Sequence, residues 1–134
     1  MLEESLCKWF AKKIGFNDFS GGIAASGGTL SNLNALIAAR NNAGLGTNPN
    51  SVLLVSEDAH SSFIKCIRVM GLDTTNLVRI KTDNQGRMDV NDLSKSLDKC
   101  SIENKKIFAI VATLGTTVRA VSYTHLTLPT IREV

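Results

Sequence analysis

A glycine turn that runs directly into a long helical pattern constrains this chain more than any other stretch. Residues 26–40 read SGGTLSNLNALIAAR, and Gly27 and Gly28 let the backbone turn tightly without a Cβ clash. We expect Ser26 or Thr29 to cap the helix, whose first N–H groups and positive dipole end favour a phosphate. The stretch therefore indicates either a phosphate site or an ordinary capped helix. Helical spacing predicts one buried face made of Leu30, Leu33, Leu36 and Ile37.

Length and composition are those of about one soluble globular domain, with 134 residues of which 43% are hydrophobic and 20% charged. No run of about 18 apolar residues occurs, and the N-terminus has no secretory pattern. We therefore expect a cytoplasmic protein without a membrane partner. The net charge of +3 is scattered without interleaved aromatics, which does not indicate nucleic-acid binding. The three cysteines are widely spaced and predict reduced, packed thiols rather than a disulfide framework or metal site.

Helical and strand patterns alternate along the chain and predict an α/β fold with a mostly parallel sheet and flanking helices. Strands are expected at residues 51–56, 77–81 and 107–112, with 51–56 buried on both faces. Ligands in such a sheet bind at the carboxyl ends of the strands. Those ends are residues 56–60 and 113–117.

Helices are expected at residues 2–14, from the glycine turn to residue 40, between His60 and Gly71, and after Asp89. Gly15 and Gly71 are predicted stops, and Asp89 is a predicted N-cap. The first helix carries an apolar face that needs a partner surface, formed by Leu2, Leu6, Trp9, Phe10 and Ile14.

Four motifs occur in the order and spacing of a known enzyme family. They are SGGTLSNLNALIAAR, then SEDAHSS with His60, then TDNQGRMDVNDL, and VATLGTT at residues 111–117. Together they resemble the pyridoxal-phosphate-dependent amino-acid decarboxylases of the glutamate and aromatic-amino-acid group, over roughly residues 1–119. The resemblance implies part of the large domain of the aspartate-aminotransferase fold (fold type I). It also implies pyridoxal 5'-phosphate as cofactor, an L-amino acid as substrate, release of CO2 to give an amine, and a homodimer.

The resemblance also assigns individual residues. Gly28 and Thr29 match the positions that hold the cofactor phosphate, and His60 matches the catalytic histidine that stacks on the pyridine ring. Thr117 matches a residue near the phenolic oxygen of the cofactor and the substrate, and Ser31 and Asn32 are further candidates beside the phosphate. By residue type alone, His60 could instead be a surface or helix-entry residue, and Thr117 could bond its own backbone. No metal ligand is assigned.

The resemblance implies two further groups that this sequence lacks. The carboxylate that pairs with the ring nitrogen and the lysine that forms a Schiff base should both follow the GTT motif. We therefore expect residues 1–120 to be a fragment of the cofactor-binding large domain, inactive by itself.

The last residues, VSYTHLTLPTIREV, depart from the family pattern. Residues 121–130 are what one reading frame of a common transposase sequencing adapter encodes, with Ala120 at the junction. We expect residues 121–134 to be a library artefact that forms no domain.

Two other functions stay open at this point. A cysteine desulfurase or a sphingosine-phosphate-lyase-like enzyme would use the same cofactor and a similar turn before a helix. A non-catalytic nucleotide-binding or scaffold module would share the alternating pattern, but the chain has no GxGxxG or Walker-type motif. Within the decarboxylases, GGTLSN resembles the glutamate and diaminobutyrate branch, which favours a small or acidic amino acid as substrate.

Overall fold

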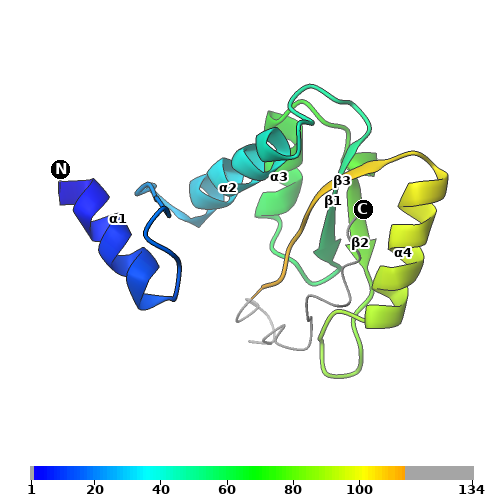
Figure 1. Ribbon diagram of the computed structural model, residues 1–134. Coiled ribbons are helices and arrows are strands. Elements are labelled where there is room, and N and C mark those ends of the chain that lie inside the picture. The colour runs from blue at the N-terminus through cyan, green and yellow to red at the C-terminus, as the bar shows by residue number, and fades with distance from the viewer. Residues whose placement is uncertain (1, 114–134) are drawn as a thin grey trace. The chain divides into compact units, whose positions relative to one another are not determined.

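The computed structural model describes residues 2–113, which belong to two compact parts divided between Ser31 and Asn32. The helix α2 begins in the first part and continues into the second (Figure 1). In chain order the elements are α1 (Leu2–Lys13), α2 (Gly28–Asn42), β1 (Ser51–Ser56), α3 (Ser62–Val69), the short 3-10 helix η1 (Thr74–Asn76), β2 (Leu77–Ile80), α4 (Val90–Ile102) and β3 (Lys106–Ile110).

A parallel three-stranded sheet in the order β2-β1-β3 organises the second part. In β1, Leu53 pairs with Leu77 of β2, and Ser51 pairs with Lys106 of β3. All six residues of β1 are buried, because the strand has a neighbour on each side and a hydrophobic core on each face. This confirms the predicted parallel sheet and its doubly buried first strand.

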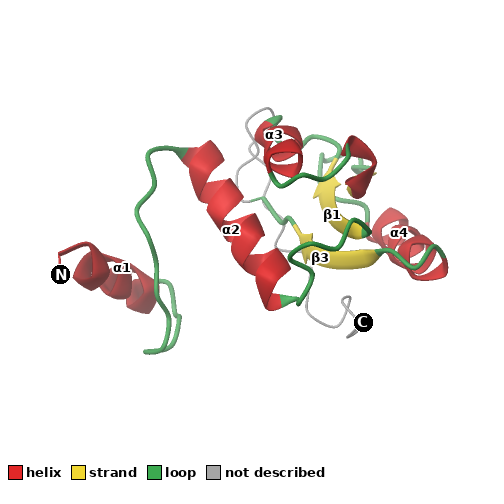
Figure 2. Ribbon diagram, turned by 90° about the horizontal axis from the view of Figure 1, so that it is seen from above, coloured by secondary structure: helices red, strands yellow, loops and turns green. Residues whose placement is uncertain are grey.

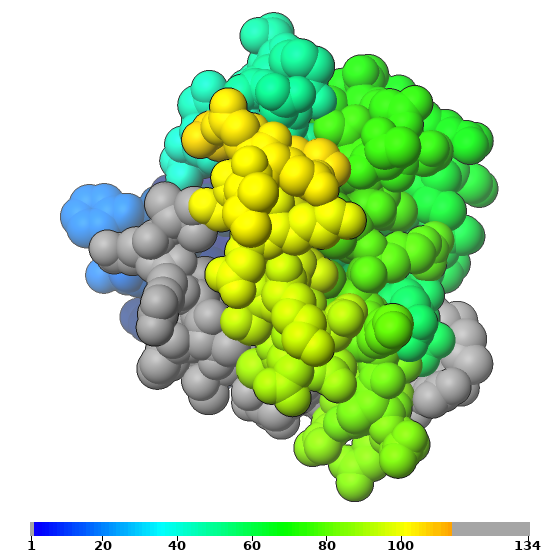
Figure 3. Space-filling view, turned by 90° about the vertical axis from the view of Figure 1, so that its right-hand side faces the viewer, coloured from blue at the N-terminus to red at the C-terminus, as the bar shows by residue number. Residues whose placement is uncertain are grey.

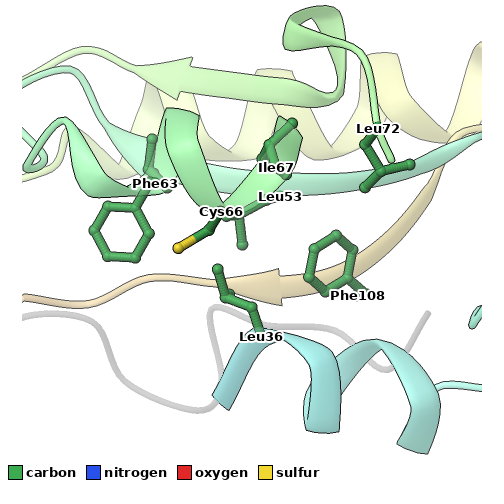
Figure 4. Packing of buried hydrophobic residues seen from close by; sticks show 8 residues of the cluster. Leu36, Leu53, Phe63, Cys66, Ile67, Leu72 and Phe108 are labelled. Atoms are coloured by element: carbon green, nitrogen blue, oxygen red, sulfur yellow. The ribbon is translucent and has the colours of Figure 1, made fainter. Parts of the chain in front are cut away.

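Alternate residues of β1 supply two separate cores, as the two-residue repeat of a strand requires. Leu53 and Val55 point into the core beneath α2 and α3, where they meet Phe63, Ile67 and Phe108 (Figure 4). Val52 and Leu54 point into the core beneath α4. Figure 2 shows α4 on the opposite side of the sheet from α2 and α3. Helices therefore cover both faces, as the sequence predicts.

The helix α4 begins at the predicted cap. Asp89 Oδ1 accepts hydrogen bonds from the backbone N–H groups of Asn91 (2.7 Å) and Asp92 (3.1 Å), which satisfies two donors of the first turn. Its apolar face buries Leu93 and Cys100, while its outer side lies open to solvent in Figure 3.

Within residues 2–113, the four α-helices end in the same backbone motif, in which two N–H groups turn back to carbonyls of the last turn. In α3, for example, Gly71 N–H donates to Arg68 O and Leu72 N–H to Ile67 O, both at 3.0 Å. Gly71 has a φ of +72°, a left-handed conformation that suits glycine. Leu72 is thereby returned to the core against Ile67. The corresponding left-handed residues of the four helices are Gly15, Gly44, Gly71 and Asn104.

The first part of the chain exposes the apolar face of α1. Ile14, for example, is 70% exposed, and Ala11 is the buried residue of this helix. Trp9 and Phe10 pack edge to face with ring centroids 5.0 Å apart, but both remain half exposed. The need for a partner surface therefore remains a prediction.

The predicted buried face of α2 is wrong in part. Leu36 is buried and Leu33 packs against the core, but Leu30 is 42% and Ile37 39% exposed. Because each residue turns an α-helix by about 100°, Leu36 shares its side with Arg40 rather than with Leu30. Arg40 is 6% exposed and completes the buried strip in place of a hydrocarbon side chain.

The Arg40 guanidinium binds the loop that follows α2 and the end of α3. Its Nε donates to Leu45 O (2.9 Å), Nη1 to Met70 O (3.0 Å) and Nη2 to Asn48 O (3.0 Å). One side chain thus joins three backbone carbonyls, of which Leu45 O and Asn48 O also accept from Ser51 Oγ.

We expect Arg40→Ala to lower the free energy of unfolding by about 3 kcal/mol, because it removes three hydrogen bonds from a charged donor together with the packing of a buried side chain. Urea unfolding measures the change. Arg68→Ala, an exposed arginine in the last turn of α3, is the control and should change stability by about 0.5 kcal/mol or less. Equal effects of the two substitutions would contradict the bridging role of Arg40.

Candidate functional site

The loop after β1 is held by hydrogen bonds to the end of β2 and by hydrogen bonds within its own turn. Glu57 N–H donates to Ile80 O at the end of β2 (2.8 Å), and the Glu57 carboxylate accepts from the N–H and hydroxyl of Thr82. Ser56 Oγ accepts from Asp58 N–H (3.2 Å), and Ser56 O accepts from Ala59 N–H (3.0 Å). These bonds turn the chain sharply away from the sheet just before His60.

His60 stands between this turn and the start of α3, with its side chain exposed. Its Nδ1 accepts a hydrogen bond from the backbone N–H of Ser62 at 3.1 Å. A ring nitrogen that accepts a hydrogen bond carries no proton, so the neutral imidazole has its proton on Nε2. The prediction that His60 lies at the carboxyl end of a strand is confirmed, and it is also a helix-entry residue.

A cavity of about 200 Å³ lies at the carboxyl ends of β1 and β3, where the sequence predicts a ligand. Its wall combines the imidazole of His60, the polar side chains of Asn32 and Asp58, and the apolar side chains of Phe63 and Val111. Ala59, Ala112 and Thr113 complete the lining. Such a wall suits a flat aromatic ring that carries polar substituents.

Asn32 reaches the same place from the second turn of α2. Its Nδ2 donates to Ser62 Oγ at 3.4 Å, a bond between residues 30 positions apart in the sequence. Ser62 is 2% exposed and is the first residue of α3. The structure thus brings Asn32, His60 and Ser62 together at one edge of the cavity.

Gly28 and Thr29 open α2 in the first part of the chain. Gly27 O accepts the first backbone hydrogen bond of the helix, from Ser31 N–H at 3.0 Å, so Gly27 occupies the N-cap position. The prediction of Ser26 or Thr29 as cap is therefore wrong, since the helix begins one residue after Gly27. The assignments of Gly28 and Thr29 to a phosphate remain predictions. Thr117 lies outside the described residues.

Residues 2–113 contain no cluster of three or more histidine, cysteine, aspartate or glutamate side chains able to hold a metal ion. The cysteines in this range, Cys7, Cys66 and Cys100, form no disulfide. Burial raises the pKa of the Cys66 thiol in α3 and of the Cys100 thiol in α4. In the same range, none of the helices has the length and apolar character needed to cross a membrane.

Comparison with known proteins identifies the family. The conserved domain of pyridoxal-dependent decarboxylases matches residues 1–128. The chain belongs to this family. The match includes residues 121–128, which lie outside the described residues, so the origin of the tail stays a prediction.

Named relatives and a solved structure agree with this membership. The chain is 32% identical to an aromatic-L-amino-acid decarboxylase of Bacillus atrophaeus, over 87% of this chain and 24% of the relative. It is 31% identical to an L-2,4-diaminobutyrate decarboxylase of Acinetobacter baumannii, over 87% of this chain and 27% of the relative. The crystal structure of mouse CSAD in apo form superposes with a TM-score of 0.83 at 29% identity, over 92% of this chain and 27% of that chain. The chain thus spans about a quarter of the length of these proteins.

Family membership also establishes the fold class and the cofactor. The fold is a piece of the fold type I architecture of pyridoxal-phosphate enzymes, as predicted. Pyridoxal phosphate is the cofactor of the pyridoxal-dependent decarboxylases, and the mixed aromatic, polar and apolar wall beside His60 fits its ring. The match favours this family over a cysteine desulfurase, a lyase of the sphingosine-phosphate type or a nucleotide-binding module.

Sequence reasoning did not select Asp58 or Phe63 as site residues. Both line the cavity beside His60. The signal for Asp58 was its place in the loop directly after a buried parallel strand. Phe63 was assigned to the helical core pattern, and it does belong to that core while also forming part of the cavity wall.

The buried thiols lead to a prediction about reactivity. Because burial raises the pKa of Cys66 and Cys100, a smaller fraction of each is thiolate at neutral pH, so both should resist a maleimide reagent in the folded protein. Mass spectrometry after brief labelling at pH 7 should find Cys7, which is partly exposed, modified first. All three should react once urea unfolds the chain, whereas equal labelling in the folded state would contradict the burial argument.

Proposed function

We propose that this chain is part of the cofactor-binding domain of an amino-acid decarboxylase that releases CO2 from an L-amino acid and leaves an amine. The observation that carries the proposal is His60 at the edge of a cavity at the carboxyl ends of parallel strands, in a member of the pyridoxal-dependent decarboxylase family. When bound, pyridoxal phosphate supplies an electron sink for the carbanion left by the departing CO2.

His60 would serve as the stacking residue for the pyridine ring. Its imidazole is exposed at the cavity edge, and its Nδ1 is fixed by the Ser62 N–H, so the ring has a defined orientation. The side chains of Phe63 and Val111 give part of the same cavity an apolar wall. A held aromatic side chain keeps a flat ligand in one plane without reorganising during the reaction.

Gly28 and Thr29 would hold the phosphate at the beginning of α2. The first backbone N–H groups of a helix point beyond its start, and the helix dipole adds partial positive charge there. A Cβ added at Gly28 would meet no atom within 4 Å, which indicates open space beside this backbone. Thr117, by family resemblance, would lie near the phenolic oxygen of the cofactor.

The remaining features of the enzyme are proposed from resemblance. We propose a cytoplasmic homodimer whose Schiff-base lysine and ring-nitrogen carboxylate follow the GTT motif in the uninterrupted gene. Residues 1–120 would be a fragment of the large domain, and residues 121–134 a library-derived tail. A fragment that lacks these two groups should be inactive by itself.

The substrate is proposed to be a small or acidic amino acid. The supporting feature is GGTLSN at residues 27–32, which resembles the glutamate and diaminobutyrate branch. The overall sequence identity does not distinguish between substrate classes, since the aromatic and diaminobutyrate enzymes named above are 32% and 31% identical to this chain.

The function is tested on the protein encoded by the uninterrupted gene. Adding pyridoxal phosphate should produce the visible absorbance band of the bound cofactor, and labelled CO2 should be released from glutamate, diaminobutyrate or a related amino acid. Aromatic amino acids and cofactor-free enzyme serve as comparisons. Absence of both the absorbance band and CO2 release from every amino acid would reject the proposal.

Substitutions at Thr29 and His60 should separate cofactor retention from turnover. Thr29→Ala removes a group proposed to bind the phosphate and should weaken cofactor affinity by roughly 1 to 3 kcal/mol, with little change in turnover at saturating cofactor. His60→Ala should lower turnover even at saturating cofactor, because the lost contact lies against the ring where charge develops. Cofactor titration and kcat at saturation measure the two effects. Unchanged affinity and turnover in His60→Ala would leave this histidine as a helix-entry residue.

A further inference from the structure

We propose that Asn32 and Ser62 are positioning residues that hold the His60 imidazole in one orientation and one tautomer. Ser62 is the residue they share. Its backbone N–H donates to His60 Nδ1 at 3.1 Å, while its hydroxyl oxygen accepts from Asn32 Nδ2 at 3.4 Å. A role of this arrangement in catalysis rests on the proposed function, whereas the hydrogen bonds among Asn32, His60 and Ser62 are independent of it.

Ser62 suits this role because it is buried and begins a helix. At 2% exposure its hydroxyl has little access to solvent, so a side-chain partner such as Asn32 replaces water. Ser61 stands before it at the N-cap with helical backbone angles and makes no side-chain cap hydrogen bond. The His60 ring therefore takes the place of the usual cap by accepting from the first N–H of α3.

The tautomer of His60 follows from this cap. As long as Ser62 N–H points at Nδ1, the neutral ring carries its proton on Nε2 and keeps one nitrogen as a donor. A shift of the first turn of α3 would release Nδ1 and let the ring rotate and exchange tautomers. The position of the first turn of α3 therefore determines the orientation and the tautomer of His60.

Asn32 supplies that control from a different helix. It lies in α2, its amide joins Ser62 across the cavity edge, and it lines the same cavity as His60. The core below is apolar, with Leu36 of α2 near Phe63 and Cys66 of α3 in one cluster. Dispersion contacts in this core hold α2 and α3 together but are not directional. The hydrogen bond from Asn32 to Ser62 is directional, so it fixes the position at which α3 begins.

Hydrogen exchange at the Ser62 amide tests the proposal without cofactor. In the cofactor-free full-length protein, we expect the Ser62 N–H to exchange about fivefold faster in Asn32→Ala and in Ser62→Ala, because the first turn of α3 opens more often. The double variant should exchange no faster than the faster single variant, since both substitutions remove the same contact. His60→Ala, which removes the acceptor itself, is the positive control. Asn42→Ala, an exposed asparagine at the end of α2, should match wild type.

Exchange of the β1 amides reports whether a variant still folds. If Asn32→Ala raises exchange throughout β1, that variant is unfolded too often to be informative. The test then rests on Ser62→Ala, which keeps the backbone N–H donor. Wild-type exchange at Ser62 in both variants, or effects that add in the double variant, would overturn the proposal.

The loaded enzyme provides a second measurement. Both variants should lower kcat and reduce the visible circular-dichroism band of the bound cofactor, and Ser62→Ala, which removes no side chain from the cavity wall, should keep KM and cofactor affinity within about twofold of wild type. Faster exchange in a protein without decarboxylase activity would reject the proposed function and leave the contacts intact. Normal decarboxylation together with unchanged exchange of the Ser62 amide would support the proposed function and reject the positioning role of Asn32 and Ser62.

Discussion

Burial of β1 on both faces is the constraint on which the second part of this chain depends. An apolar run with no alternation cannot face water on either side, so it needs a neighbouring strand at each edge and a helix layer on each face. In the order β2-β1-β3, a strand lies at each edge of β1. The helices α2 and α3 cover one face of the sheet, and α4 covers the other. The loop that carries His60 leaves the end of this strand, so a fully buried strand positions the candidate site.

Much of this arrangement was predictable because local signals agreed with the tertiary structure. The run SVLLVS predicts a doubly buried strand, Asp89 predicts the start of α4, and Gly71 the end of α3, and each is confirmed. The bounds of β1 are as predicted, whereas those of β2 and β3 differ by one or two residues. For example, β3 ends at Ile110, although Val111 N–H still donates to Leu54 O.

The failures share a different cause, which is contact between distant residues. Periodicity counted Leu30 and Ile37 as core, yet Arg40 lies on the buried side because carbonyls from two other segments meet there. No pattern within α2 contains that information. Asn32 was singled out by its place near the start of the helix, but its bond to Ser62 depends on how α2 and α3 pack. The cavity could thus be located from the sequence, while the partners that orient its side chains could not.

The strand order has a consequence for how such a site arises. From β1 the chain passes through α3 to β2 on one side, and then through α4 to β3 on the other. The first connection leaves β1 for β2 along one face of the sheet, and the second leaves β2 and crosses the other face to β3, so neither joins β1 directly to its neighbour β3. The crevice at the carboxyl ends of β1 and β3 is thus a product of connectivity, independent of which side chains line it. Substitution of the lining can therefore change the chemistry of the crevice without removing the crevice.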